Sequence, residues 1–217
     1  MSRFPLVVRS AAVFVVCLAT HAAAQASDPL GKLDPTSRFT VDAAIDSARA
    51  AGLPWTVLRL RALEGLSKGV DNRAVAAAVR RRFTHLKDAR AALGQVGDDE
   101  LAAAAELLEG DKIKPEQLVP FRGAQRGRSP LLAFTVLGDL LTRGVPRDEA
   151  MSAITRYWQN GAADADFMGL FRGVESDILQ GLNPGAALQN RVREFPGRAP
   201  SGIKPTPPTG EQETPNA

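Results

Sequence analysis

The sequence predicts an all-α fold, arranged as an irregular array of helical hairpins. Alanine, leucine, arginine and glutamate, which favour helices, are abundant, and the alternation of β-branched residues typical of strands is missing. A glycine followed by an aliphatic residue and then by Pro, Asp or Asn also occurs four times, at 52–54, 69–71, 144–146 and 181–183. This motif suits a tight joint between two helices.

The first 26 residues have the pattern of a signal peptide. Arg3 and Arg9 form a basic region, residues 11–19 are apolar but too few to span a bilayer, and small residues at 24–26 suit cleavage near Ala26. We therefore expect an exported chain that is periplasmic or extracellular after cleavage and does not span the membrane. Retention of the segment as a membrane anchor is the alternative.

Removal of residues 1–26 would change the composition in two ways. The formal charge would fall from +3 to +1, because two arginines and no acids are lost, so we do not expect a nucleic-acid partner. Cys17, the sole cysteine, would also be lost. That loss excludes disulfides, thiolate nucleophiles and cysteine–zinc sites from the mature chain.

The remaining chain divides into three parts. Residues 27–39 are polar, contain Pro29 and Pro35, and are predicted to be a linker. Residues 40–195 are predicted to form one helical domain, long enough to bury a core. Residues 196–217 contain six prolines and little that could be buried, which predicts a disordered tail.

Helical periodicity and end signals locate the elements of this domain. We expect a helix at 40–52, where Thr40 or Asp42 would cap the start, and a second at 55–68. The longest helix is expected at 72–93, because apolar residues recur there at helical spacing. The remaining helices are expected at 99–110, 114–123, 130–144, 146–161, 164–181 and 184–195, with a basic loop at 123–130.

The four joints are predicted to share one geometry. The glycine would follow a helix end in the left-handed conformation, the aliphatic residue would pack back on that helix, and the third residue would start the next helix. The residues predicted to build these turns are Gly52, Gly69, Val70, Asp71, Gly144, Val145, Pro146, Gly181 and Asn183. Val70 and Val145 are expected to be buried, Asp71 and Asn183 to act as caps, and Pro146 to lie in a first helical turn.

Two of the joints also align over their flanking residues. When residues 64–83 are placed on 139–158, the apolar positions match and Phe83 falls on Trp158. Trp158 is therefore predicted to anchor the core, and Tyr157 to be exposed. The alignment predicts a degenerate repeat. Chance recurrence of helix-cap residues in a helix-rich chain is the alternative.

The chain shows no pattern of a catalytic centre, so no catalytic, cofactor-binding or metal-binding residue is predicted. Glu64 with Lys68, and Asp139 with Arg143, are predicted to be exposed ion pairs between residues four apart on a helix. A small hydrolase that uses Glu64 and Asp139 as paired carboxylates is the alternative. His85, the only histidine after the predicted signal, has no nucleophile motif near it and is predicted to be a surface residue.

Basic residues suggest another kind of site. The three successive arginines at 80–82 would fan around a helix, whereas positions 73, 80 and 87 would share one face. That face and the loop at 121–128 would suit an anionic envelope polymer. A solvated helix face is the alternative. The candidate anion-binding residues are Arg73, Arg80, Lys87, Arg122, Arg126 and Arg128.

The stretch LRALEGLSKGV, followed by AVAAAVRRRFTHLKDARAAL, resembles a motif of uncharacterised exported bacterial helical proteins. That motif reads lysine or arginine, Ala-Leu-Glu-Gly, any residue, Ser or Ala, and Lys-Gly-Val. The resemblance covers residues 60–93, and the family pattern usually has Pro where Asp71 stands. It implies a bacterial source and an envelope location, and it implies no activity.

These observations predict an exported, non-catalytic interaction or scaffold protein of the bacterial envelope, with an unidentified envelope protein as its partner. Two alternatives stay open. One is a carboxylate-dependent small hydrolase, and the other is a binder of an anionic envelope polymer through a basic helix face.

Overall fold

The computed structural model describes residues 28–123 and 128–194, and these ranges contain helices and no strand. The predicted all-α fold is thus confirmed. The α-helices are α1 (Pro35–Ala50), α2 (Trp55–Ser67), α3 (Asn72–Leu93), α4 (Asp98–Leu108), α5 (Leu131–Thr142), α6 (Arg147–Gln159), α7 (Asp164–Leu179) and α8 (Pro184–Glu194). The 3-10 helices in these ranges are η1 (Pro29–Lys32), η2 (Glu109–Asp111) and η3 (Pro115–Phe121). The predicted signal peptide at 1–26, the predicted tail at 196–217 and Arg126 lie outside the described residues.

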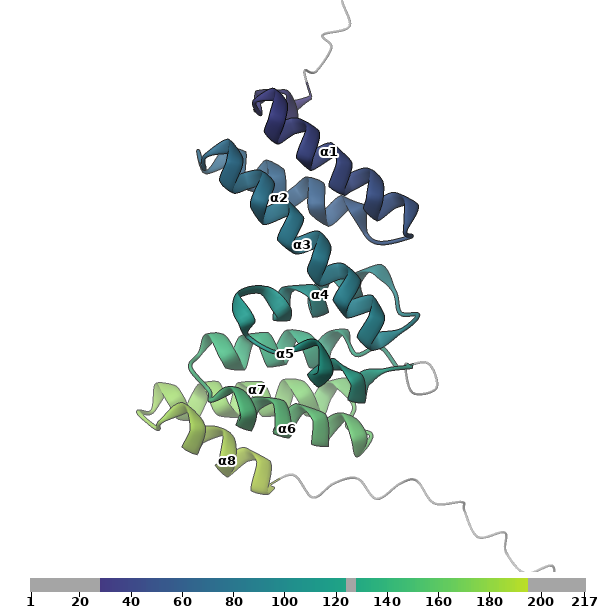
Figure 1. Cartoon of the computed structure of the whole chain (residues 1–217). Coiled ribbons are helices and arrows are strands. Elements are labelled where there is room, and N and C mark those ends of the chain that lie inside the picture. The colour runs from purple at the N-terminus through teal and green to yellow at the C-terminus, as the bar shows by residue number, and fades with distance from the viewer. Residues whose placement is uncertain (1–27, 124–127, 195–217) are drawn as a thin grey trace, which may run out of the picture.

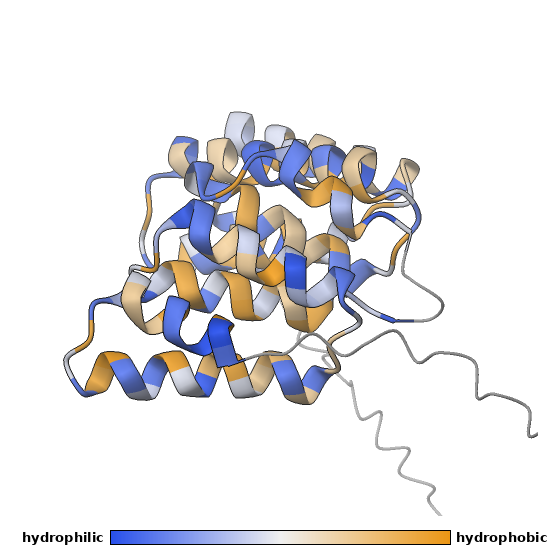
Figure 2. Cartoon of the chain, turned by 90° about the horizontal axis from the view of Figure 1, so that it is seen from below, coloured by the Kyte–Doolittle hydropathy of each residue, from blue (hydrophilic) through white to orange (hydrophobic). Residues whose placement is uncertain are grey.

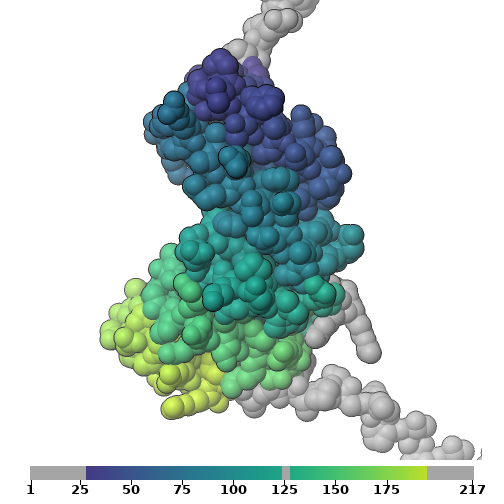
Figure 3. All heavy atoms as spheres, viewed as in Figure 1, coloured from purple at the N-terminus to yellow at the C-terminus, as the bar shows by residue number. Residues whose placement is uncertain are grey.

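Helix α3 joins the two ends of the molecule. Figure 1 shows it running diagonally from the α1–α2 pair toward α4, with α5, α6, α7 and α8 stacked beyond. It packs against α1, α2, α4 and η3, and its 22 residues make it about 33 Å long, at about 1.5 Å per residue. The space-filling view in Figure 3 shows the molecule narrowed between the α1–α2 pair and the helices that follow α4.

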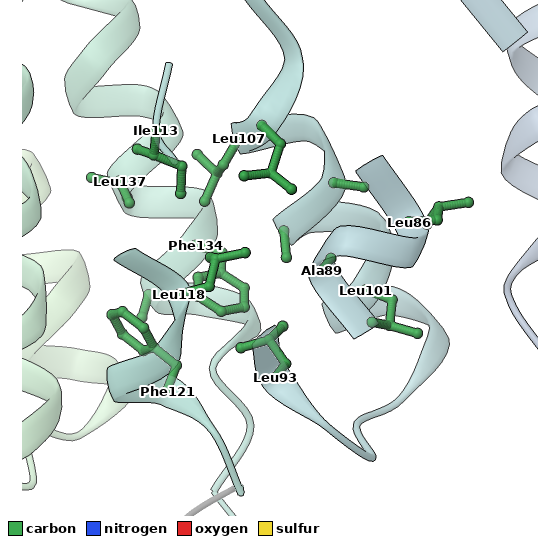
Figure 4. Close-up of a cluster of buried hydrophobic side chains, with 14 of the residues drawn as sticks. Leu86, Ala89, Leu93, Leu101, Leu107, Ile113, Leu118, Phe121, Phe134 and Leu137 are labelled. Carbon is green, nitrogen blue, oxygen red and sulfur yellow. The ribbon is translucent and has the colours of Figure 1, made fainter. Parts of the chain in front are cut away.

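A buried cluster holds α3, α4, η3 and α5 together (Figure 4). Its labelled members are Leu86, Ala89, Leu93, Leu101, Leu107, Ile113, Leu118, Phe121, Phe134 and Leu137. Phe121 meets Phe134 edge to face, with ring centroids 5.1 Å apart, a geometry that adds about 0.5–1.5 kcal/mol beyond the buried area. Figure 2 shows hydrophobic and hydrophilic residues together on the helices, as expected of amphipathic helices around a shared core.

The segment before the first predicted helix is part of the fold, so the prediction of a linker at 27–39 is wrong from residue 28 onward. Leu30 and Leu33 are buried, and α1 begins at Pro35 rather than at residue 40. The carboxylate of Asp34 caps α1 by accepting hydrogen bonds from the N–H groups of residues 36 and 37, both at 3.0 Å. An aspartate followed by a first-turn proline is a strong start signal for a helix.

The predicted caps Thr40 and Asp42 lie inside α1 instead. The hydroxyl of Thr40 donates to the carbonyl of Thr36 at 3.0 Å, and the carboxylate of Asp42 accepts from Nε of Arg38 at 2.6 Å. Both side chains therefore bond within the helix rather than at its end.

The predicted joints have the expected backbone at each glycine. Their φ angles are +62° at Gly52, +67° at Gly69, +82° at Gly144 and +94° at Gly181. At Gly144, its own N–H and that of the next residue donate to the carbonyls of Leu141 and Leu140, both at 3.1 Å, which satisfies the last turn of α5. A further joint of this kind lies at Gly161, where the predicted motif is absent because two alanines follow.

The two aligned joints differ in what covers them. Val145 is only 3% exposed, as predicted, whereas Val70 is 41% exposed, so the prediction of a buried Val70 is wrong. A Cβ built on Gly144 would lie 3.9 Å from Pro184, which shows that the α7–α8 joint lies against the α5–α6 joint. At Gly69 no atom lies within 4 Å of such a Cβ. Neighbouring elements therefore decide the burial, and the degenerate repeat stays a prediction.

The residues predicted to start the next helices do so at two joints. The carboxylate of Asp71 accepts from the N–H groups of Arg73 and Ala74, at 3.0 and 3.2 Å. Asn183 caps α8 in the same way, because its Oδ1 accepts from the N–H of residue 185 at 3.0 Å. Pro146 was expected in the first turn of its helix, but it occupies the cap position just before α6.

Two adjacent aromatic residues of α6 are both buried. Trp158 anchors the core, as predicted, and its ring lies 5.7 Å from that of Phe121. Tyr157 is also buried and packs 5.9 Å from the ring of Phe167 in α7, so the prediction of an exposed Tyr157 is wrong. Burial raises the pKa of its phenol to about 12. The reason is that α6 packs against α5, η3 and α8, and the ring of Phe167 adds cover on Tyr157.

Candidate functional site

One side of α2 faces a cleft instead of the core. The residues on this side, three or four positions apart, are Val57, Leu60, Arg61, Glu64 and Ser67. Leu60 keeps 64% of its surface exposed, and the half-buried Val57 and Leu63 flank it. Single exposed leucines are common on protein surfaces, but an exposed leucine inside a cleft with apolar neighbours marks a surface that a partner can cover.

The cleft lies between α2 and the end of α4, with α3 between them, and has a volume of about 690 Å³. We call it the α2–α4 cleft and define it by the α2 residues above together with Leu63, Arg82, Glu106 and Glu109. It exists because α3 is long enough to hold the α1–α2 pair at one end and α4 at the other. The narrowed part of the molecule in Figure 3 is consistent with this hollow.

Arginines bridge the walls of the α2–α4 cleft. Arg82 of α3 is only 11% exposed at its side chain, and its guanidinium lies 3.3 Å from the carboxylate of Glu109 and 3.5 Å from that of Glu106. It also donates to the carbonyl of Ala102 at 3.2 Å. Arg61 of α2 reaches across to Glu109 at 3.6 Å. The carboxylates of Glu106 and Glu109 are therefore paired with the guanidinium of Arg82. The contact between Arg61 and Glu109 links α2 to the end of α4.

Glu64 forms the ion pair that the sequence predicted. Its carboxylate accepts from Nζ of Lys68 at 2.5 Å and from Nη1 of Arg61 at 3.0 Å. These hydrogen bonds, that from Lys68 first, lower the pKa of the Glu64 carboxyl below its ordinary value. A general acid needs a raised pKa. The environment of Glu64 therefore favours a permanently charged surface group.

The second predicted pair is wrong. Arg143 does not bind Asp139; it pairs with Glu175 of α7, and its guanidinium lies 4.5 Å above the ring of Phe171. The packing of α7 against α5 supplies both partners. Asp139 lines a separate hollow between α4 and α5, so Glu64 and Asp139 do not face one cleft as the hydrolase alternative requires.

His85 is half-buried and lines a shallow hollow, which agrees in part with the prediction of a surface residue. Its Nδ1 is buried, and no described residue makes a hydrogen bond with it. A catalytic histidine needs an orienting carboxylate or carbonyl on one ring nitrogen and a nucleophile on the other. Among residues 28–123 and 128–194, no three or more His, Cys, Asp and Glu side chains are grouped so as to hold a metal ion.

The structure separates the candidate anion-binding residues. Arg122 donates to the carbonyls of residues 91 and 92, at 2.6 and 2.8 Å, and so closes the end of α3. Arg128 donates to the carbonyl of residue 162 and lies 4.4 Å above the ring of Trp158. Both guanidinium groups thus bond to main-chain carbonyls. Arg73, Arg80 and Lys87 are exposed together on α3.

Several residues of the cleft were not singled out from the sequence. Leu60, Arg82, Glu106 and Glu109 carried no signal of their own, although apolar residues on more than one side of α2 were a hint. Gly65 is a further case, since a Cβ there would lie 2.7 Å from Cγ2 of Val75. The glycine of the Ala-Leu-Glu-Gly motif thus lets α3 approach α2 closely.

In the part of the chain that the structure describes, no helix combines the length and the apolar character needed to cross a bilayer. Comparisons with protein-family models, with characterised proteins and with solved structures found no match. The function is therefore argued from the residues of the cleft and of the helix surfaces.

Proposed function

We propose that this chain is a non-catalytic interaction protein of the bacterial envelope, and that a partner protein binds in the α2–α4 cleft. The observation that carries the proposal is the exposed Leu60, flanked by Val57 and Leu63 inside a cleft of about 690 Å³. An apolar centre with a polar rim is the usual arrangement of a protein–protein interface.

The charges around Leu60 indicate the kind of segment that would bind. Glu106 has an exposed side chain, whereas Arg82 is nearly covered, so the carboxylate of Glu106 is the more accessible charge. A partner segment that places an apolar side chain on Leu60 and a basic group near Glu106 complements this surface. The hydrogen bonds from Lys68 and Arg61 lower the pKa of Glu64, so this carboxylate lacks the proton that a general acid would donate.

The proposed location rests on the pattern of residues 1–26 and on the resemblance of residues 60–93 to exported bacterial proteins. It is tested by the mass of the protein recovered from the periplasm or the medium. A chain that begins near residue 27 is expected. Full-length protein found in the membrane fraction would favour the anchor alternative.

Site-specific photo-cross-linking tests the cleft. A photoreactive phenylalanine analogue is placed at Leu60, and in a control protein at Leu179, which is 83% exposed on α7. We expect one discrete cross-linked protein from position 60 and none from position 179. Leu60→Asp should weaken binding of that protein by about 2 kcal/mol, as hot-spot residues do, whereas Leu179→Asp should leave it unchanged.

Two results would contradict the proposal. One is equal loss of binding in the Leu60→Asp and Leu179→Asp proteins, because exposed apolar surface in general would then be responsible. The other is a turnover of any substrate that Glu64→Gln abolishes, because the cleft would then hold an enzyme.

A further inference from the structure

The exposed side of α3 carries cations that have no acidic partner. Arg73, Arg80, Arg81 and Lys87 are exposed, and none has a carboxylate oxygen within 4 Å in the described part of the chain. We call these four residues the α3 basic stripe. Arg38, Arg49, Arg59 and Arg61 of α1 and α2, by contrast, each pair with a carboxylate at 2.6–3.0 Å.

The stripe is continuous and nearly straight. Positions 73, 80 and 87 lie on one side of the helix, and fourteen residues separate its ends, which is about 21 Å at about 1.5 Å per residue. Ala77, Thr84 and the half-buried Phe83 lie between the cations, and Nζ of Lys87 lies 5.4 Å from the centre of the Phe83 ring. Acids lie near the stripe, because Asp88 of α3 is half-buried beside Lys87 and Arg81 shares a second hollow with Glu109 and Asp111.

A shallow hollow lies at the middle of the stripe. It has a volume of about 310 Å³ and is lined by Ala77, Arg80, Arg81, Thr84 and His85. The hydroxyl of Thr84 donates to the main-chain carbonyl of Arg80 at 3.3 Å, so its proton is engaged within the helix. Two adjacent guanidinium groups provide several N–H donors in planar forks, an arrangement that fits the oxygens of a phosphate group.

We propose that the α3 basic stripe binds a linear polymer of phosphate groups. A chain of closely spaced anions can neutralise all four cations along about 21 Å, which a single small anion cannot do. The guanidinium forks at the hollow can pair with phosphate and with carboxylate oxygens, so a polycarboxylate is the comparison that the test includes. Arg81 also lines a hollow with Arg61 and Glu109 of the α2–α4 cleft. None of the four stripe residues lines that cleft itself, so the proposal does not depend on the cleft.

Binding of fluorescein-labelled long-chain polyphosphate, followed by fluorescence anisotropy, tests the proposal. The affinity of the purified protein is expected to fall as salt rises, because binding releases counterions, by about 0.7 in log–log slope for each neutralised charge of a single-stranded polyanion. The Arg80→Gln/Arg81→Gln protein should therefore show a slope shallower by about 1.4. Its affinity should be lower by roughly 25-fold, since each basic residue near an anionic surface contributes about a factor of five.

A matched control removes two exposed arginines elsewhere. Arg147 of α6 and Arg172 of α7 are exposed and lie outside the stripe. The Arg147→Gln/Arg172→Gln protein has the same net charge as the stripe variant and should bind polyphosphate about as well as the unmodified protein. Both double variants should keep the far-UV circular dichroism spectrum and the Tm of the unmodified protein.

Four results would overturn the assignment. Two concern polyphosphate itself, namely equal losses of affinity in the two double variants and an affinity that does not change with salt. The other two concern the ligand, namely tighter binding of polyglutamate than of polyphosphate, and binding only to vesicles of phosphatidylcholine and phosphatidylglycerol. The Leu60→Asp protein should bind polyphosphate normally. A failure of the proposed cleft function can therefore be told apart from a failure of this site.

Discussion

Replacement of Gly65 by alanine is a sensitive test of how α2 and α3 pack. In the interior of a helix this change normally stabilises a protein by about 1 kcal/mol. Here the added Cβ would lie 2.7 Å from Cγ2 and 3.5 Å from Cγ1 of Val75, which is buried and stiff about χ1. Overpacking of this kind costs about 1–3 kcal/mol. We therefore expect Gly65→Ala to lower the free energy of unfolding by up to about 2 kcal/mol.

A second substitution shows whether Val75 is the cause. Val75→Ala removes two buried methyl groups and should by itself cost about 2–3 kcal/mol. In that background the space beside residue 65 is free, so Gly65→Ala should now stabilise the protein by about 1 kcal/mol. The double-mutant cycle should give a coupling of about 1–3 kcal/mol between the two positions.

Urea unfolding of the four proteins, followed by far-UV circular dichroism, measures this coupling. The m-value should stay constant, so that differences in midpoint report differences in stability. If Gly65→Ala stabilises the protein equally in both backgrounds, the coupling is zero. The close approach of α3 to Gly65 would then be wrong.

Two further predictions concern burial and pH. Val145→Ala should lower the free energy of unfolding by about 2 kcal/mol, whereas Val70→Ala should change it by less than about 1 kcal/mol, because of the two only Val145 is buried. Chemical denaturation measures both values, and similar values would contradict the difference between the two joints. Hydrogen bonds from Arg191 are the main cause of a lowered pKa at the buried Asp177. The stabilisation from this pair is therefore present above the ordinary pKa of 3.8, and it is lost as the pH falls through the lower pKa of the folded state. The Tm of the Asp177→Asn protein should thus approach that of the unmodified protein as the pH falls, and parallel Tm curves would refute this reasoning.

The joints could be predicted from the sequence because their chemistry is local. The φ angle of +82° at Gly144 and the helix cap formed by Asp71 depend only on neighbours within five residues. Such local signals are visible in the amino-acid sequence. The start of α1 is signalled in the same local way, by Asp34 and Pro35. The prolines of this polar segment suit a linker equally well, so they do not distinguish the two structures.

The cleft could not be predicted, because it depends on where distant helices lie. The three arginines at 80–82 are equivalent by composition, and only the approach of α4 places Arg82 between Glu106 and Glu109. The same holds for Leu60, whose exposure follows from the separation of α2 and α4. Arg143 pairs with Glu175, 32 positions along the chain, rather than with Asp139, four positions before it, because α7 packs against α5 at this point.

Helix α3 has a consequence for how the molecule unfolds. Its N-terminal half carries Val75, which packs at Gly65 of α2, and its C-terminal half carries Leu86 and Leu93, which lie in the cluster with α4 and η3. Detachment of the α1–α2 pair would expose the apolar residues of α3 at one end and leave the other end anchored. Helix α3 therefore couples the stability of the α1–α2 pair to that of the helices beyond α4. Amide hydrogen exchange in α3 should be slower than in α1 or α8.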